Sequence, residues 1–124
     1  MIDDEAGALL GPVAGIDGFL LGCLVDAVTG MVVASRSDHD DINLPAAAAA
    51  AMDIAQALSL LATELPTDGL EDVLVTFRDQ LYVTRLINTD AEPQLLLVVL
   101  LDRGLANLAM ARREVRAFCA SYAG

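Results

Sequence analysis

The strongest constraint on this chain is an uninterrupted apolar run near its C-terminal end, from Leu95 to Leu101, which stops at Asp102-Arg103-Gly104. A run of this length is far too short to cross a bilayer as a helix, which takes about 20 residues. Because turn-forming residues flank it, the run predicts a strand that is buried on both faces of a sheet. A pattern of helical period follows at once, without a catalytic nucleophile, a metal cluster or a phosphate loop. This combination favours an assembly module over an enzyme.

The size and composition of the chain determine what kind of core it can form. Residues 1–124 are predicted to form a single domain, which is long enough to bury about two thirds of its unfolded surface. Hydrophobic residues make up 56% of the sequence, but aromatic residues only 4%, so the core must be aliphatic. The high apolar fraction fits surface buried between subunits, and it fits simple enrichment in alanine equally well.

Charge is distributed unevenly along the chain, whose net charge is −11. Residues 1–77 contain thirteen acidic residues and one arginine, whereas residues 78–124 contain five acidic residues and six arginines. An acidic chain repels phosphate backbones and anionic membranes, which excludes nucleic-acid binding and peripheral membrane binding as main functions. The acidity serves either a basic partner surface or solubility alone.

The cysteines and the N-terminus predict a cytoplasmic protein. Cys23 and Cys119 are isolated and have no CxxC spacing, which favours buried reduced thiols over a disulfide. The first five residues lack the basic segment of a signal peptide, and we expect no transmembrane segment.

Apolar periodicity and turn residues predict an α+β fold with the element order (α)ββαβββα. The helices are expected over residues 4–14, residues 44–65 and the segment after Gly104. The strands are expected over residues 19–26, 31–35, 71–77, 81–87 and 95–101. Short connections between the strands predict a five-stranded antiparallel sheet, with the long central helix crossing over between the first hairpin and the last three strands.

Polar residues mark the expected ends of the two main helices. Asn43 is predicted to cap the N-terminus of the long helix, with Pro45 in its first turn. Asp102 is predicted to cap the C-terminal helix, and Asn107 is expected in the first turn of that helix.

The helix over residues 44–65 is unusual because it is apolar around most of its circumference. One stripe is expected to pack on the sheet: Ala47, Ala51, Ile54, Leu58, Leu61 and Leu65. Apolar residues, most of them alanines, lie on the remaining surface, where Asp53 is one of few polar residues: Ala46, Ala49, Ala50, Ala57 and Leu60. Such a surface lets a second helix approach closely and predicts a homodimer seam, to which Ile54 at the edge of the stripe is also assigned. The alternative is an exposed alanine-rich helix kept for its helix propensity.

The polar residues provide no signature of an enzyme. His39, the only histidine, lies among aspartates in a loop without the spacing of an EF-hand, and a solvated acidic loop is expected there. The glycines match neither a P-loop nor a dinucleotide fingerprint, so we assign no catalytic, metal or cofactor residue. Five arginines remain as candidates for contact with a partner, although a solvated surface explains them as well: Arg36, Arg78, Arg103, Arg112 and Arg116.

The sequence resembles the Roadblock/dynein light chain family over nearly its whole length. The matching parts are Gly18–Asp26 with the turn at Thr29-Gly30, the alanine-rich helix and Asp72–Leu86. The most specific part is Leu95–Leu101 followed by Asp102–Arg112. The use of arginine as the only cation and the many alanines are typical of a bacterial, especially an actinobacterial, member.

The resemblance implies a dimer in which the long helices pack together and the third strands join two sheets. It assigns the helix over residues 44–65 and the strand over residues 71–77, including Val73 and Val75, to this seam. It also implies a non-catalytic scaffold or regulator that biases a Ras-like small GTPase between its nucleotide states. An arginine finger acting in trans from Arg36, Arg78 or Arg103 is left open.

Two other functions remain open at this point. The first is a purely structural dimerisation subunit without a GTPase partner. The second is a small-molecule sensor, which is disfavoured because sensor pockets are usually lined by aromatic residues and this chain has few.

Overall fold

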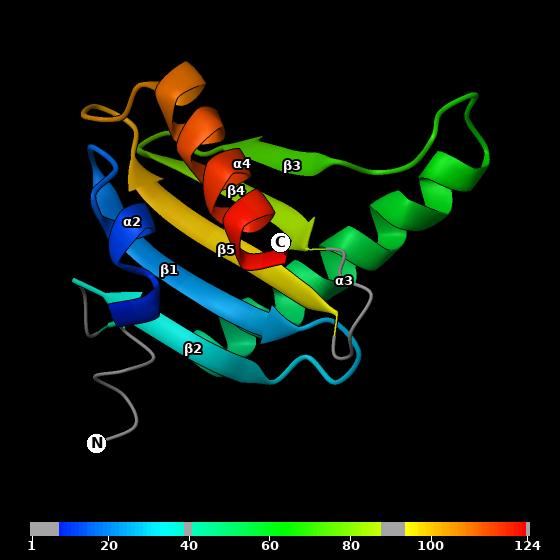
Figure 1. The fold of residues 1–124 in the computed structure, drawn as a ribbon, viewed down its shortest axis with the longest axis horizontal. Coiled ribbons are helices and arrows are strands. Elements are labelled where there is room, and N and C mark those ends of the chain that lie inside the picture. Colours follow the sequence, from blue (N-terminus) through cyan, green and yellow to red (C-terminus); the bar gives the residue numbers. More distant parts are fainter. Residues whose placement is uncertain (1–7, 39–40, 88–93, 124) are drawn as a thin grey trace.

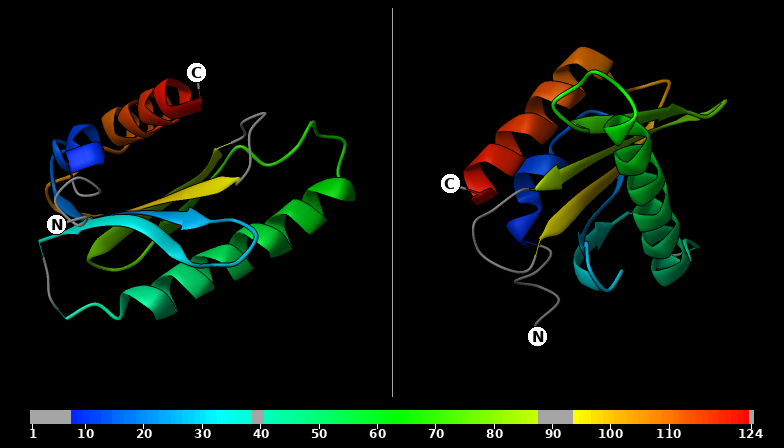
Figure 2. Two further views of the ribbon diagram at one scale, coloured as in Figure 1. Left: turned by 60° about the horizontal axis from the view of Figure 1, so that its bottom comes forward. Right: turned by 90° about the vertical axis from the view of Figure 1, so that its right-hand side faces the viewer.

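A computed structural model describes residues 8–38, 41–87 and 94–123. A five-stranded antiparallel sheet lies between α3 on one face and α2 with α4 on the other (Figure 1; Figure 2). The strands are β1 (Phe19–Asp26), β2 (Val32–Ser37), β3 (Asp72–Thr76), β4 (Gln80–Ile87) and β5 (Leu95–Asp102). The helices are α2 (Gly11–Ala14), α3 (Leu44–Thr63) and α4 (Leu108–Ala123). The predicted fold class and element order are confirmed.

The apolar strand β5 lies at the centre of the sheet, whose strand order is β2-β1-β5-β4-β3. It pairs antiparallel with β1 on one side and with β4 on the other. Residues 95–99 and Leu101 are buried. The prediction of a strand covered on both faces is therefore confirmed.

Alternate residues of β5 enter two separate cores, as the two-residue period of a strand requires. Leu97 and Val99 join the core under α4, where Val115 is also buried. Leu96 and Val98 join a smaller core under α3. The sheet therefore separates the molecule into two apolar layers.

The hairpin of β1 and β2 forms at the predicted reversal. The Asp26 Oδ1 atom accepts hydrogen bonds from the backbone N–H groups of Val28 (2.8 Å) and Thr29 (3.1 Å). Gly30 follows with a φ of 79°, a left-handed conformation that glycine adopts without steric cost. This left-handed conformation explains why a glycine occupies the last position of the turn.

The N-cap of α3 is as predicted, and the start of α4 is not. The Asn43 Oδ1 atom accepts a hydrogen bond from the backbone N–H of Ala46 at 3.1 Å, and Pro45 lies in the first turn. At α4, the Asn107 Oδ1 atom accepts from the N–H of Met110 at 3.1 Å. Asp102 instead accepts from the N–H of Gly104 at 2.8 Å and closes the turn after β5. The predicted cap at Asp102 is therefore wrong, because a full turn separates β5 from α4.

The face of α3 that packs on the sheet is rotated from the predicted stripe. Ala48 and Ala51 are fully buried, whereas Ile54 and Leu61 are exposed to 38% and 50%. The small side chains of Ala48 and Ala51 let the helix approach the sheet closely at these positions. Ala47, Leu58 and Ala51 keep their predicted orientation, but Ile54, Leu61 and Leu65 do not.

Two predictions fall partly outside the described residues. Residues 4–7 of the expected first helix are not described, and its described part includes α2, where Val13 is buried. His39 and Asp40 of the acidic loop also lie outside the described residues.

Candidate functional site

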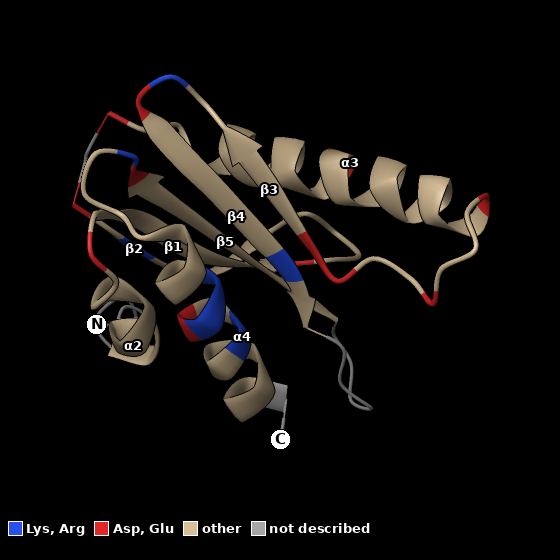
Figure 3. Ribbon diagram, turned by 90° about the horizontal axis from the view of Figure 1, so that it is seen from above, with Lys and Arg blue, Asp and Glu red and all other residues tan. Residues whose placement is uncertain are grey.

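The most prominent surface is the side of α3 that points away from the sheet, which we call the outer face of α3. All seven helix positions predicted for the seam lie on it and are exposed: Ala46, Ala49, Ala50, Asp53, Ile54, Ala57 and Leu60. Asp53 is the only charged residue of α3, and Figure 3 shows the helix almost free of charge. Leu60 is exposed to 69%. The outer face is therefore an uncovered apolar surface on a regular helix.

The edge strand β3 provides a second surface that can join another chain. It lies at one end of the strand order and pairs only with β4 among the described strands. Val73 is buried and Val75 is half-buried, whereas Leu74 is exposed to 40%. The edge therefore offers an open row of backbone hydrogen-bonding groups, together with an exposed leucine.

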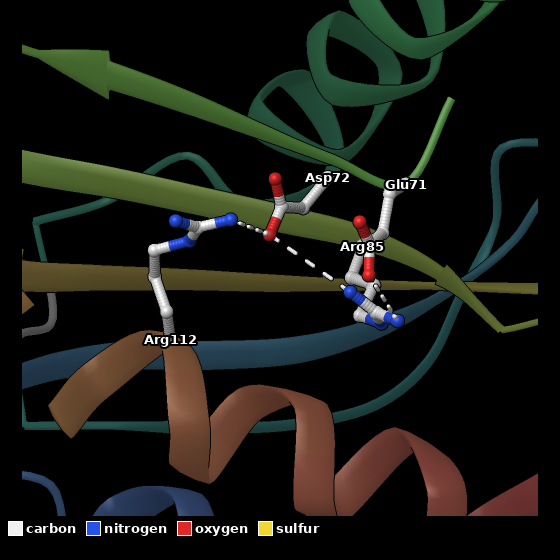
Figure 4. Close-up of polar contacts among 4 residues, drawn as sticks. All are labelled: Glu71, Asp72, Arg85 and Arg112. Carbon is white, nitrogen blue, oxygen red and sulfur yellow. Dashed lines mark hydrogen bonds and ion pairs between the residues drawn. The ribbon is translucent and has the colours of Figure 1, made fainter. Parts of the chain in front are cut away.

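Four charged residues form a network between β3, β4 and α4 (Figure 4). The Asp72 Oδ2 atom lies 3.2 Å from Arg112 Nη2 and 3.9 Å from Arg85 Nη1. Arg85 Nη2 donates to Glu71 Oε1 at 3.3 Å. Asp72 thus pairs with two guanidinium groups and ties the edge strand to α4. No motif in the sequence pointed to these pairs, and the only available signal was the single arginine within a predicted strand, Arg85.

The five candidate arginines lie at separate places. Arg112 is held by Asp72, while Arg116 is exposed farther along α4. Arg78 and Arg103 lie on neighbouring loops, because Arg103 Nη1 donates to the carbonyl oxygen of Phe77 at 3.3 Å. Arg36 is exposed on β2, at the opposite edge of the sheet from β3. The described chain therefore gathers no single arginine cluster.

The two cysteines are not equipped for nucleophilic chemistry. Both are free and buried, on opposite sides of the sheet. Burial raises the pKa of Cys23 to about 12 and that of Cys119 to about 11. Because the thiolate is the reactive form, both thiols are inert at neutral pH.

The charge that acts on the Cys119 thiol does not change this conclusion. The Arg85 guanidinium acts to lower the pKa of Cys119, but burial is the larger effect, and the pKa remains raised to about 11. Among the described residues, no group of three or more His, Cys, Asp or Glu side chains is placed to hold a metal ion. The outer face of α3 and the open edge of β3 therefore remain as the candidate site.

The length and composition of α3 also meet the requirements of a membrane-spanning helix, a feature that we did not predict from the sequence. It is the only described helix that does so, and only 11% of the residues in its most apolar stretch are buried. The core helices of soluble proteins pass the same test of length and composition. Here Ala48 and Ala51 pack against the sheet, so α3 is part of the fold and its exposed side is the feature to explain.

The fold matches solved structures closely, although the sequences differ. An MglB structure with a tetrameric arrangement matches with a TM-score of 0.81 at 18% identity, covering 98% of this chain and 87% of that chain. Myxococcus xanthus MglB matches with 0.77 at 15% identity, covering 98% and 91%. A Roadblock/LC7 domain from Streptomyces avermitilis matches with 0.75 at 18% identity, covering 95% and 92%. Neither a protein-family model nor a curated protein matches the sequence.

Proposed function

From the Roadblock-family fold of this chain, we propose that it is a non-catalytic homodimeric scaffold that binds a Ras-like small GTPase and biases its nucleotide state. The observation that carries the proposal is the outer face of α3, an apolar helix surface that nothing in the described chain covers. The similarity to MglB structures supports an assembly function, and one of these has a tetrameric arrangement.

The composition of the outer face fits association with a second copy. Homodimer interfaces are more apolar than ordinary protein surface. The alanines at positions 46, 49, 50 and 57 let two helix backbones approach closely, while Ile54 and Leu60 supply larger apolar area. An isologous contact would use the same surface on both copies. The open edge of β3 could extend the contact from helix to sheet.

The proposed effect on the GTPase is a shift of population. A dimer that binds one nucleotide state more tightly than the other stabilises that state by the difference in binding free energy. No reactive side chain of the scaffold is needed for such an effect. The exposed arginines at positions 78 and 103, on neighbouring loops, are available for contact with the partner.

Substitution of the outer face tests the homodimer. Ala50→Glu and Ile54→Glu would each bury a carboxylate in an apolar seam, so we expect the dimer dissociation constant to rise by at least about tenfold. Sedimentation velocity over a concentration series measures this change. Ala120→Glu, on the exposed side of α4, is the matched control and should leave the dimer dissociation constant unchanged. Native mass retained by both α3 variants would refute the seam.

Affinity capture tests the GTPase partner. The tagged protein is incubated with native lysate containing either a non-hydrolysable GTP analogue or GDP, and the captured proteins are identified by mass spectrometry. A small GTPase enriched in one nucleotide state is the expected result. Partners captured equally in both conditions would favour the second candidate function, a purely structural dimerisation subunit, which the same outer face of α3 would serve.

A further inference from the structure

A cavity of about 370 Å³ lies between the second half of α3 and one end of the sheet. Met52 and Ala55 of α3 form one wall, and Leu86 and Leu96 of the sheet form the opposite wall. Ala27, after β1, lines it from the hairpin. Its volume lies within the range of about 300–1,000 Å³ that is usual for small-molecule sites.

The cavity arises from the path of α3 rather than from a single missing side chain. Ala48 and Ala51 hold the first half of the helix close to the sheet. The helix then continues past the end of the sheet, as Figure 1 and Figure 2 show. Beyond Ala51 no residue of α3 is fully buried, so the helix and the sheet leave space between them. Because a helix and a sheet form the two walls, the space is a property of the fold.

The side chains around the cavity select for an uncharged aliphatic molecule. None of the described residues that line it is aromatic, lysine or arginine. A charged ligand would find no unpaired counter-charge, because the two acidic residues that line the cavity, Glu71 and Asp72, already pair with arginines. Burying such a charge is costly. Gln56 and Ser59 at the exposed side can form hydrogen bonds with a hydroxyl group.

We propose that this cavity binds an uncharged aliphatic molecule that carries a hydroxyl group, with its chain between α3 and the sheet and its hydroxyl near Gln56 and Ser59. This function is independent of the proposed GTPase partner. It also differs from the aromatic-lined sensor site that the sequence argued against, because none of the described residues that line the cavity is aromatic.

Octanol is the probe for this site, with octanoate and octylammonium as charged counterparts. Isothermal titration calorimetry should show saturable binding of one octanol per chain, and both charged molecules should bind at least about tenfold more weakly. In the unmodified protein, methyl resonances of Met52, Leu86 and Leu96 should shift during the octanol titration. The absence of saturable binding, or equal binding of all three probes, would overturn the proposal.

Two variants that fill the cavity from different elements test its position. Ala55→Leu on α3 and Ala27→Leu in the hairpin should each abolish octanol binding, while circular dichroism verifies the fold. Ala120→Leu, on the exposed side of α4, is the matched control and should bind octanol normally. Octanol binding that survives both filled variants would contradict the proposal.

A second copy is the competing occupant of the cavity. If its side chains fill the space, Ala55→Leu will weaken self-association and the unmodified protein will not bind octanol, which would also overturn the proposal. Octanol binding by a protein that remains monomeric would instead support the cavity while contradicting the homodimer. The two proposals can therefore fail separately.

Discussion

Asp72 connects more of the molecule than any other single charged residue described here. It begins the edge strand β3, and its carboxylate pairs with Arg112 of α4 and Arg85 of β4. Its side chain is only 13% exposed, so solvent screens these pairs less than it screens the Arg85–Glu71 pair, where Glu71 is 61% exposed. Removing the charge of Asp72 would leave two partly buried guanidinium groups without their common counter-ion.

We therefore predict that Asp72→Asn lowers the free energy of unfolding by about 1–2 kcal/mol, between the values typical of exposed and buried pairs. Urea denaturation followed by circular dichroism measures the change. Glu71→Gln, which removes the more exposed carboxylate, is the control and should cost less than about 1 kcal/mol. An equal loss of unfolding free energy in the two variants would show that the Asp72 carboxylate stabilises the fold no more than the Glu71 carboxylate does.

At the scale of elements, the two long helices begin with the same device, a side-chain amide oxygen that accepts a backbone hydrogen bond three residues on. Asn43 caps α3 and Asn107 caps α4, each at 3.1 Å. Both asparagines are exposed, so their substitution tests the cap with little change in packing.

Asn43→Ala and Asn107→Ala should each lower the free energy of unfolding by about 1 kcal/mol, since an orphan N–H group of the first turn loses its acceptor. Asn43→Ser and Asn107→Ser retain an acceptor and should lie closer to the parent protein. Thermal or urea unfolding of all four variants provides the measurement. An alanine variant as stable as its serine counterpart would show that the cap contributes little at that helix.

Sequence patterns predicted these elements well where the signal was local. The predicted bounds of the strand over residues 19–26 are confirmed, as is the cap at Asn43. The rotation of α3 was missed, because a helix that is apolar all round does not indicate which side the sheet will cover. The cap of α4 was misplaced, because Asp102 and Asn107 are both good capping residues and only the length of the turn decides between them.

The candidate site was predictable only in part. The outer face of α3 was identified from its small residues, and those residues are exposed, but the homodimer stays a prediction. The pairing of Asp72 with Arg112 joins residues 40 positions apart and has no local signature. The cavity depends on where α3 leaves the sheet, which the pattern of a single helix does not contain.

At the scale of the whole molecule, the sheet divides the interior into two layers, and each layer contains one thiol. Cys23 lies in the layer under α3 and Cys119 in the layer under α4. Burial raises the pKa of both thiols above the ordinary value of 9.0. The unfolded chain therefore releases these protons at a lower pH than the folded chain, which destabilises the fold as pH rises.

We predict that the stabilising effect of the two buried thiols is fully present below about pH 9 and is lost progressively as pH rises towards the raised pKa values. Urea midpoints at about pH 8 and about pH 10 should decrease less in the double variant Cys23→Ala/Cys119→Ala than in the parent. The same decrease of the urea midpoint in both proteins would show that other groups cause the loss of stability at alkaline pH.

Alkylation of the two cysteines with iodoacetamide should be slow in the native parent protein and fast in urea, because burial protects both thiols in the fold.

The central place of β5 has a consequence for how the chain reaches its fold. The strand that joins the two halves of the sheet is the last described strand in the sequence, so synthesis releases β1 and β4 before their shared neighbour exists. Pairs such as Cys23 with Val98 close a very long loop, a topology of high contact order that slows folding. Until β5 emerges from the ribosome, β1 and β4 keep unpaired edges that can join other chains. Nascent chains of this protein are therefore most vulnerable to aggregation just before their most apolar segment appears.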